Sequence, residues 1–190
     1  MPRIATAVLT LVIGTAGCSD HSNHSDRAAE PLTVRSLPWV AAEETRLVDS
    51  LGREIAIRGI NARVEGLFDV TFDDGRLALE PIPAFSGEDA RDMVRLGFNV
   101  LRLPVNWSGM EPHEGEFSEA YFERLDQVID LASAAGLYVL LDFHQDAWSK
   151  EIGEDGAPLW AIVPPPVQLL EGPLDDLAAR RVSPQVRNAF

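Results

Sequence analysis

Val100–Trp107, VLRLPVNW, and Val139–Asp146, VLLDFHQD, are two apolar runs that each end in polar residues. Nearly continuous apolar runs of this length are typical of parallel strands buried on both faces. Period two still sorts the side chains, which puts Arg102 on one face of the first strand and places Asp142 and His144 together on one face of the second. A charged side chain between apolar neighbours is costly to bury without a partner. We therefore expect these three side chains to hydrogen-bond one another.

Helices with clear start and stop signals precede both runs. Ser86 and Asp89 form a capping-box pattern, and Gly97 suits the position just past a helix end. Ser118 caps a second helix, which Gly136 ends. The apolar residues of this second helix recur at helical spacing: Phe122, Leu125, Val128, Ile129 and Ala132. Strand, loop, helix and turn thus follow one another as in a βα repeat, and barrels of such repeats carry their active sites where the strands end.

The pattern predicts an α/β fold, a partial (β/α)8 TIM barrel that covers about the first three βα units. Leu47–Asn61 is interpreted as an N-terminal β-hairpin, whose second half, Glu54–Asn61, would be the first barrel strand. Val70–Leu79 has the pattern of a small hairpin within the following loop. The prolines at 164–166 exclude a helix there. One weak helix around Leu174–Arg181 and no fourth strand are expected after them.

Residues 1–18 have the features of an export signal. Ile4–Ile13 is apolar but too short to span a membrane, which takes about 20 apolar residues. The small residues before Cys18, the only cysteine, resemble a bacterial lipobox, in which the cysteine is lipidated, although Thr15 stands where that motif usually has Leu. An ordinary signal peptide and a buried cysteine are the alternatives. The expectation is an exported bacterial lipoprotein, periplasmic or at the cell surface.

The remaining chain divides into two parts. Residues 19–35 are polar, lack an apolar period and are interpreted as a flexible tether. Residues 36–190 are interpreted as one domain, the N-terminal part of a barrel. The formal net charge of −14 disfavours binding to nucleic acid or to anionic lipid headgroups. Membrane association is therefore expected only through a lipid anchor at Cys18.

Four motifs occur in order: RGIN at 58–61, NVLRLPVNW at 99–107, AAG at 134–136 and LYVLLDFHQDAWS at 137–149. Together they resemble glycoside hydrolase family 5, the cellulase-like clan of retaining glycosidases. Within that family, HQDAWS followed by GEDGAPLWA at 153–161 most resembles the endoglycoceramidase-like branch. Members of that branch cleave between the oligosaccharide and the ceramide of a glycosphingolipid. The resemblance implies an oligosaccharide or glycolipid substrate and no cofactor.

The resemblance also implies a complete (β/α)8 barrel and two catalytic glutamates. The acid/base would lie in an Asn-Glu pair after strand four and the nucleophile at the end of strand seven, with the carboxyls about 5 Å apart. The chain has no Asn-Glu dipeptide and 190 residues, whereas such a barrel takes about 250. The expectation is an N-terminal portion, from a truncated reading frame or a gene fragment, that lacks both glutamates and has no hydrolytic turnover alone. A three-strand piece would also leave a sheet edge exposed and tend to aggregate.

The resemblance assigns roles to residues at the strand ends. Arg102 matches the arginine that orients the nucleophile carboxylate, for which its planar fork is suited. His144 matches the histidine that hydrogen-bonds a sugar hydroxyl, and Asp146 matches a sugar-contacting aspartate of the endoglycoceramidase-like branch. Asp142 is expected to brace the barrel mouth. The alternatives are a surface salt bridge for Arg102 and a satisfied core histidine for His144.

Three tryptophans are candidate platforms for sugar rings, because indole packs against the C–H faces of sugars: Trp107, Trp148 and Trp160. Packing without a ligand explains each of them equally well. Asn61, at the end of the first expected barrel strand, is expected to donate to a sugar hydroxyl or merely to close a turn.

Two other functions remain open. One is a non-catalytic carbohydrate-binding lipoprotein that uses the same strand ends. The other is a metal-dependent hydrolase that uses His144, Asp142 and Asp146. Metal chemistry needs three or more converging ligands, and no helical HxE or HxH spacing is present, so no metal is expected.

Overall fold

The computed structural model describes residues 37–68, 81–170 and 177–189. The signal peptide with Cys18, the whole tether, and the small hairpin predicted for Val70–Leu79 lie outside these ranges and stay predictions. None of the helices among the described residues has the length and apolar composition needed to cross a membrane.

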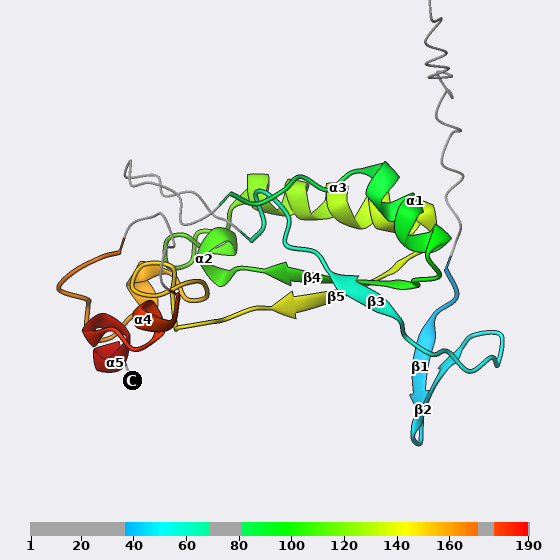
Figure 1. The fold of residues 1–190 in the computed structure, drawn as a ribbon, viewed down its shortest axis with the longest axis horizontal. Helices are drawn as coiled ribbons and strands as arrows, with labels where there is room; N and C mark the ends of the chain where they lie inside the picture. The colour runs from blue at the N-terminus through cyan, green and yellow to red at the C-terminus, as the bar shows by residue number, and fades with distance from the viewer. Residues whose placement is uncertain (1–36, 69–80, 171–176, 190) are drawn as a thin grey trace, which may run out of the picture. The chain divides into compact units, whose positions relative to one another are not determined.

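A parallel sheet of three strands, in the order β3-β4-β5, carries the site (Figure 1). The strands are β3 (Gly59–Asn61), β4 (Val100–Val105) and β5 (Tyr138–Phe143). The two apolar runs are therefore neighbouring parallel strands, as predicted, with Leu101 opposite Val139. The first barrel strand predicted from Glu54 is wrong in its first half, since strand pairing with β4 begins only at Gly59.

The two predicted helices are confirmed, and both cover the same side of the sheet in Figure 1. Helix α1 (Gly87–Arg95) has the full capping box: the Ser86 hydroxyl accepts from Asp89 N–H and the Asp89 carboxylate accepts from Ser86 N–H. Helix α3 (Glu119–Ala135) is capped by Ser118. It ends at Gly136, whose φ of 91° favours glycine.

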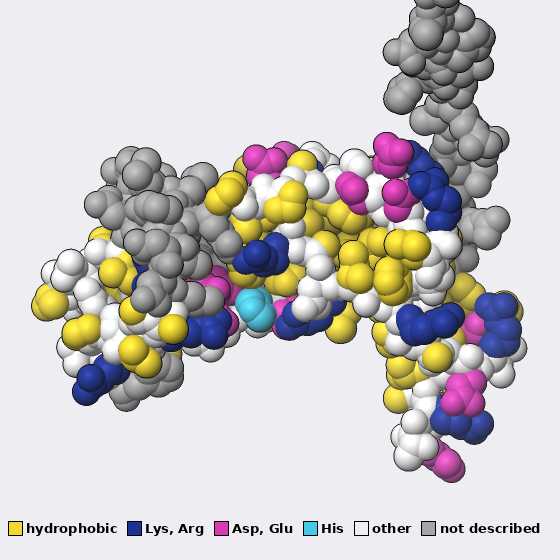
Figure 2. Space-filling view, in the orientation of Figure 1, with side chains coloured by type: hydrophobic (Ala, Val, Ile, Leu, Met, Phe, Trp, Pro, Cys, Tyr) yellow, Lys and Arg dark blue, Asp and Glu magenta, His cyan; other side chains and the backbone are white. Residues whose placement is uncertain are grey.

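The main core lies between the sheet and these helices. Leu101, Leu103 and Val105 of β4 are fully buried against Met93 of α1 and Val128 of α3. Alternation along β4 therefore sends every second side chain to the core and leaves Arg102 on the opposite face. Hydrophobic side chains are also visible at the surface over β3 and α1 in Figure 2.

Strand β5 is not buried on both faces, which corrects the prediction made from its apolar run. Leu140 is 54% exposed, Leu141 48% and Phe143 66%. Among the described residues, β5 pairs only with β4 and forms the edge of the sheet. The edge that the sequence predicted is therefore present in the fold.

The hairpin predicted over Leu47–Asn61 is wrong, because the antiparallel hairpin in the structure lies earlier in the chain. Strands β1 (Val40–Glu43) and β2 (Arg46–Asp49) pair antiparallel, and only a single bridge joins Val48 to Glu54. The tight turn after β2 forms because the Asp49 carboxylate accepts from the backbone N–H groups of Leu51 and Arg53. That turn reverses the chain but is followed by no second strand.

Four short helical segments complete the described chain. Helix α2 (Trp107–Met110) follows β4 directly, and η1 (Leu159–Ala161) is a single 3-10 turn. Helix α4 (Leu177–Arg181) stands where one weak helix was predicted, and a second helix that was not predicted, α5 (Pro184–Ala189), follows it. The prolines at 164–166 are not helical, as predicted, and no strand follows β5 among the described residues.

Candidate functional site

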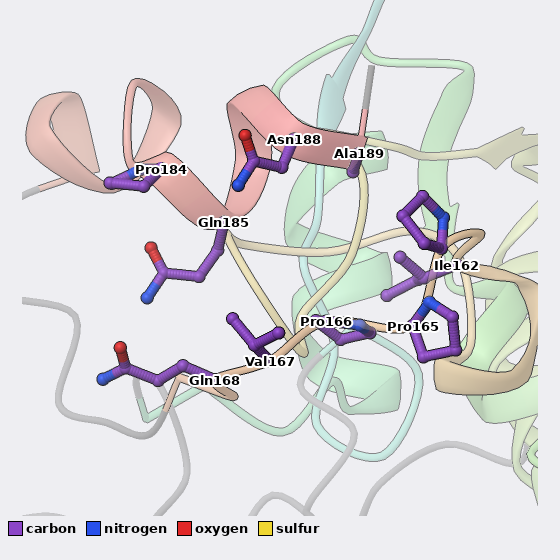
Figure 3. Close-up of a pocket in the computed structure, with 10 residues that line it drawn as sticks. Ile162, Pro165, Pro166, Val167, Gln168, Pro184, Gln185, Asn188 and Ala189 are labelled. Carbon is purple, nitrogen blue, oxygen red and sulfur yellow. The ribbon is translucent and has the colours of Figure 1, made fainter.

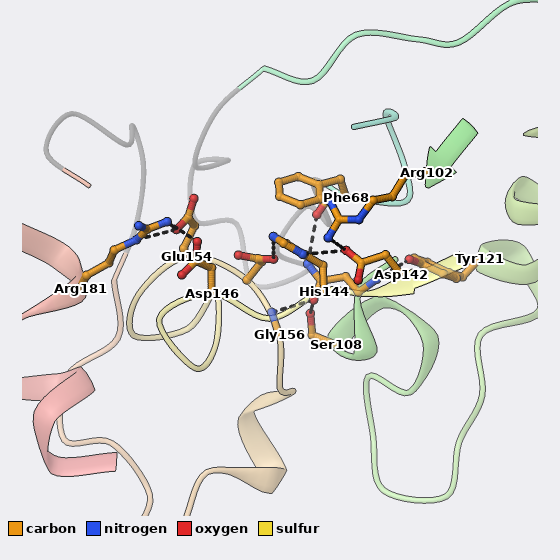
Figure 4. A network of polar contacts seen from close by, with 12 residues as sticks. Phe68, Arg102, Ser108, Tyr121, Asp142, His144, Asp146, Glu154, Gly156 and Arg181 are labelled. Atoms are coloured by element: carbon orange, nitrogen blue, oxygen red, sulfur yellow. Dashed lines mark hydrogen bonds and ion pairs between the residues drawn. The ribbon is translucent and has the colours of Figure 1, made fainter. Parts of the chain in front are cut away.

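Arg102, from the middle of β4, meets Asp142 and His144, at the carboxyl end of β5, on the face of the sheet opposite the helices (Figure 4). Asp142 Oδ2 lies 2.5 Å from Arg102 Nη2 and 2.8 Å from His144 Nδ1. The side chains of these residues are between 23% and 34% exposed, so solvent reaches them only in part. The mutual pairing predicted for these three residues is confirmed.

Strand register explains why they meet. Arg102 lies opposite Leu140, so that Asp142, two residues further along β5, reaches it diagonally on the same face. The backbone N–H of His144 donates to Val105 O at 3.0 Å, which extends the pairing one residue past β5. Asn61 of β3 lies opposite Arg102 in the parallel ladder and is exposed, so the register places it on this face as well.

Asn106 is a central residue of the site region that the sequence analysis did not single out. It is 1% exposed, and its Oδ1 accepts from Gly156 N–H at 2.9 Å and from the Ser108 hydroxyl at 3.1 Å. Its side-chain amide donates to Phe68 O at 3.1 Å. Asn106 therefore joins the segments that follow β3, β4 and β5. The sequence signal that could have identified Asn106 is its place as a polar residue directly after the buried strand β4.

Tyr121 of α3 supports the same junction from the core side. Its hydroxyl donates to Leu67 O at 2.7 Å and accepts from the backbone N–H of Asn106 at 2.8 Å. Burial raises the pKa of Tyr121 to about 12, so the hydroxyl stays protonated and keeps donating at any physiological pH.

Asp155 is a second residue that the sequence analysis missed. It lies in the segment that returns after β5, where its backbone bridges Asp146, and it is 2% exposed. Asp155 Oδ2 is 3.9 Å from His144 Nε2. Burial, reinforced by the carboxylates of Glu154 and Asp146, raises the pKa of Asp155 to about 7 against the opposing effects of His144 and Arg181.

Asp146 stands apart from the Arg102 cluster in this structure. Its carboxylate pairs with Arg181 of α4, and the same guanidinium nitrogen lies 2.9 Å from Glu154 Oε2. The two carboxylates hold the pKa of Arg181 above its usual range. The structure therefore brings Arg102, Asp142 and His144 together, while the carboxylate of Asp146 faces a cation from the C-terminal helices (Figure 4).

The tryptophans divide into two groups. Trp107 and Trp160 pack edge to face with ring centroids 5.4 Å apart, and both indole N–H groups donate to Glu111, one to its carboxylate and one to its carbonyl. Trp148 is half-buried and packs against the small cluster of Ile152. All three thus have packing roles in this structure, and a role as a sugar platform stays a prediction.

Two other observations bear on chemistry. The described residues contain no group of three or more His, Cys, Asp or Glu side chains that could hold a metal ion. A cavity of about 400 Å³ lies between residues 162–168 and α5 and is lined by apolar and amide side chains (Figure 3). None of the described residues that line this cavity is charged.

Comparison with known proteins adds the relatives of this chain. Residues 80–160 match the family model of Cellulase (glycosyl hydrolase family 5). Endoglycoceramidase I of Rhodococcus hoagii is 36% identical over 134 residues, which are 70% of this chain and 24% of that protein. Endoglycoceramidase of Cyanea nozakii is 33% identical over 132 residues, 65% of this chain and 24% of that protein. The chain thus spans about a quarter of the length of these curated relatives.

Solved structures agree with the sequence relatives. The crystal structure of an endogalactoceramidase aligns with a TM-score of 0.65 at 31% identity, covering 80% of this chain and 35% of that chain. Endo-glycoceramidase II from Rhodococcus sp., in a complex with ganglioside GM3, aligns with a TM-score of 0.58 at 26% identity, covering 76% of this chain and 33% of that chain. The matched region of the family model contains β4, β5 and the Arg102 cluster.

Proposed function

Since this chain is a member of glycosyl hydrolase family 5 and a relative of the endoglycoceramidases, we propose that it supplies sugar-binding strand ends of a glycosidase that acts on glycosphingolipids. The observation that carries the proposal is the Arg102–Asp142–His144 cluster, which joins β4 to the carboxyl end of the adjacent parallel strand β5. Parallel βα folds place their ligands at that end of the strands.

Each member of the cluster has a separate task. Asp142 takes one guanidinium nitrogen of Arg102 and leaves the rest of the planar fork for a second carboxylate, which in a retaining glycosidase is the nucleophile. His144 commits Nδ1 to Asp142, so Nε2 is its nitrogen for a sugar hydroxyl. Asn61 lies on the same face and donates to a second hydroxyl.

The sheet β3-β4-β5 with α1 and α3 corresponds, in this proposal, to about the first three βα units of a (β/α)8 barrel. The two glutamates that retaining chemistry requires would lie on later strands, because this sequence has no Asn-Glu pair. The chain alone therefore binds sugar through the cluster and does not hydrolyse it. Lipidation of Cys18 after export would hold the enzyme at a bacterial membrane.

Binding and hydrolysis are tested separately. Saturation-transfer NMR with dilute protein should show binding of the GM3 oligosaccharide to wild type and at least about tenfold weaker binding to R102A. D126N, which changes an exposed carboxylate of α3, is the matched control and should bind as wild type does. Equal binding by wild type and R102A would contradict the proposed role of the cluster.

The hydrolysis test uses a fluorescent glycosphingolipid and a cellulose oligomer. The purified chain should release no sugar from either substrate. Turnover by sequence-verified protein would contradict the proposal that this chain binds sugar without hydrolysing it. Sequencing the DNA beyond the codon for Phe190 checks whether further strands are encoded. A following strand that ends in Asn-Glu supports the glycosidase, and its absence favours a non-catalytic carbohydrate-binding lipoprotein.

A further inference from the structure

Asp155 carries a buried carboxyl group that the proposed function does not use. Both of its oxygens are buried, and neither has a hydrogen-bond partner among the described residues. The 3.9 Å between Asp155 Oδ2 and His144 Nε2 is longer than a hydrogen bond but short enough for strong charge interaction. Burying a carboxyl group without a hydrogen bond costs free energy. We therefore expect this carboxyl to have a role in its interaction with the His144 imidazole.

The backbone fixes the position of this carboxyl group. Asp155 N–H donates to Asp146 O at 3.1 Å, and Asp146 N–H donates back to Asp155 O at 3.3 Å. The next residue, Gly156, donates its N–H to Asn106 Oδ1 at 2.9 Å. A Cβ at Gly156 would lie 2.6 Å from Trp148 O, and φ there is 125°, so this tight return requires glycine.

His144 is consequently held between two carboxyl groups. Nδ1 is bound to Asp142 at 2.8 Å, and Nε2 faces Asp155. The ring of Phe68 packs against the imidazole with ring centroids 5.9 Å apart. Together these three contacts define both the orientation of the ring and the surroundings of each nitrogen.

We propose that Asp155 is a positioning residue for His144, which keeps the imidazole oriented with a hydrogen on Nε2 for donation to a sugar hydroxyl. The proposal rests on the proposed function, because it concerns the same sugar-binding histidine. Asp155 acts through His144 and does not itself contact the sugar, since its oxygens are buried. An imidazolium donates from both nitrogens, so Nε2–H can donate to a hydroxyl while Nδ1–H stays bound to Asp142.

The charge of Asp155 depends on pH in the neutral range. Burial raises its pKa to about 7, so the carboxyl is mostly neutral at pH 6 and mostly charged at pH 8. The charged groups that face it are His144 at the end of β5, Asp146 and Glu154 in the return segment, and Arg181 of α4. Asp155 is mostly charged above pH 7, so its attraction for a hydrogen on His144 Nε2, 3.9 Å away, is strongest there.

Carbethoxylation by diethyl pyrocarbonate tests this coupling, because the reagent attacks an imidazole nitrogen that carries no hydrogen. Trypsin separates His144, in peptide 125–150, from the reference His113, in peptide 103–124. At pH 8 His144 should react about three- to tenfold faster in D155N than in wild type. At pH 6 the two proteins should react alike, because Asp155 is then protonated. A dilute sample suffices, since peptides are counted by mass spectrometry.

Three controls make the result specific. E154Q removes the neighbouring carboxylate, which pairs with Arg181 at 2.9 Å, and should leave the His144 rate within about twofold of wild type. The His144 rate at pH 8 should be closer to wild type in D155E than in D155N, because D155E retains a carboxyl group. His113 in the same digests should be unchanged in every variant.

A His144 rate that is equal in wild type and D155N at pH 8, or a change that His113 shares, would overturn the proposal. If circular dichroism shows that D155N does not fold, wild type alone decides: between pH 6 and pH 8 the His144 rate should rise less than the His113 rate. An equal rise would contradict the coupling. No sugar is present in this assay, so its failure and a failure of GM3 oligosaccharide binding remain distinguishable.

Discussion

Arg102 and His144 contact the same carboxylate oxygen, Oδ2 of Asp142, at 2.5 Å and 2.8 Å. One acid therefore orients a cation on the adjacent strand and an imidazole two residues along its own strand. Both groups are then preorganised before any ligand arrives, which lowers the entropic cost of binding.

Loss of the Asp142 carboxylate should disturb both partners together. We expect D142A to weaken binding of the GM3 oligosaccharide at least about tenfold and to lower the free energy of unfolding by about 1 to 3 kcal/mol. The physical reason is that two donors, Arg102 and His144, lose their shared acceptor. Urea unfolding and NMR titration measure the two effects. D126N on α3 is the control, and equal binding by D142A and D126N would exclude the shared-acceptor role.

Asp155 should make the stability of wild type fall as the pH rises. The pKa is raised from 3.8 to about 7 in the fold, so the folded state holds a proton that the unfolded state releases between these values. The contribution of the Asp155 proton to the free energy of unfolding is largest below about pH 4. It is lost as the pH rises through 7. Between pH 4.5 and pH 7.5, wild type should lose about 1 to 4 kcal/mol more than D155N in urea unfolding. Parallel pH curves for the two proteins would contradict this.

Asn106 should be costly to replace. N106A leaves Gly156 N–H and the Ser108 hydroxyl without their shared acceptor, and it deprives Phe68 O of a donor. We expect a loss of about 2 to 4 kcal/mol in the free energy of unfolding, together with faster limited proteolysis within 145–157. N61A removes an exposed asparagine and should cost less than about 0.5 kcal/mol. Similar losses for both variants would show that Asn106 does not join the loops.

The contact between Arg181 and Asp146 should compete with sugar for the carboxylate. R181A should change the free energy of unfolding by less than about 1 kcal/mol, because the Arg181 side chain is 42% exposed. If Asp146 accepts from a sugar hydroxyl, R181A should bind the GM3 oligosaccharide about two- to fivefold more tightly. R180A is the neighbouring control. An unchanged affinity of R181A for the GM3 oligosaccharide would show that Asp146 does not bind the sugar.

Strand β5 should drive self-association through its exposed edge. Replacing Phe143, which is 66% exposed, by lysine places a charge on that edge and should reduce the sedimenting fraction several-fold. L51K changes a residue of similar exposure, 68%, in the turn after β2 and should leave sedimentation unchanged. Analytical ultracentrifugation over a concentration series measures both. Equal behaviour of F143K and L51K would show that the edge is not the contact.

Features with local signals could be predicted from the sequence, and features made by distant contacts could not. The caps at Ser86 and Ser118 and the strand after each helix are encoded within a few residues, and all were confirmed. The cluster was also predictable, since period two and the cost of burying Arg102 leave few other arrangements.

The misses share a physical cause. Strand β1 is only four residues long, VAAE, and its turn contains no glycine, so nothing local marked it. The exposure of β5 depends on what pairs with its outer edge, which its own apolar residues do not reveal. Asp155 is buried by a return of the chain to Asp146, and the role of Asn106 depends on a residue 50 positions away, Gly156.

The loops after β4 and β5 exchange two hydrogen bonds: Ser108 N–H donates to Gly156 O at 3.0 Å, and Gly156 N–H donates to Asn106 Oδ1 at 2.9 Å. Loop exchange between homologues is a common route to altered selectivity, and here it has to preserve both of these hydrogen bonds. A graft that replaces one loop alone leaves the groups of the other loop without their hydrogen-bond partners, whereas a graft of both loops keeps the two hydrogen bonds together. Engineering of this region therefore has to treat residues 106–110 and 145–157 as a single cassette.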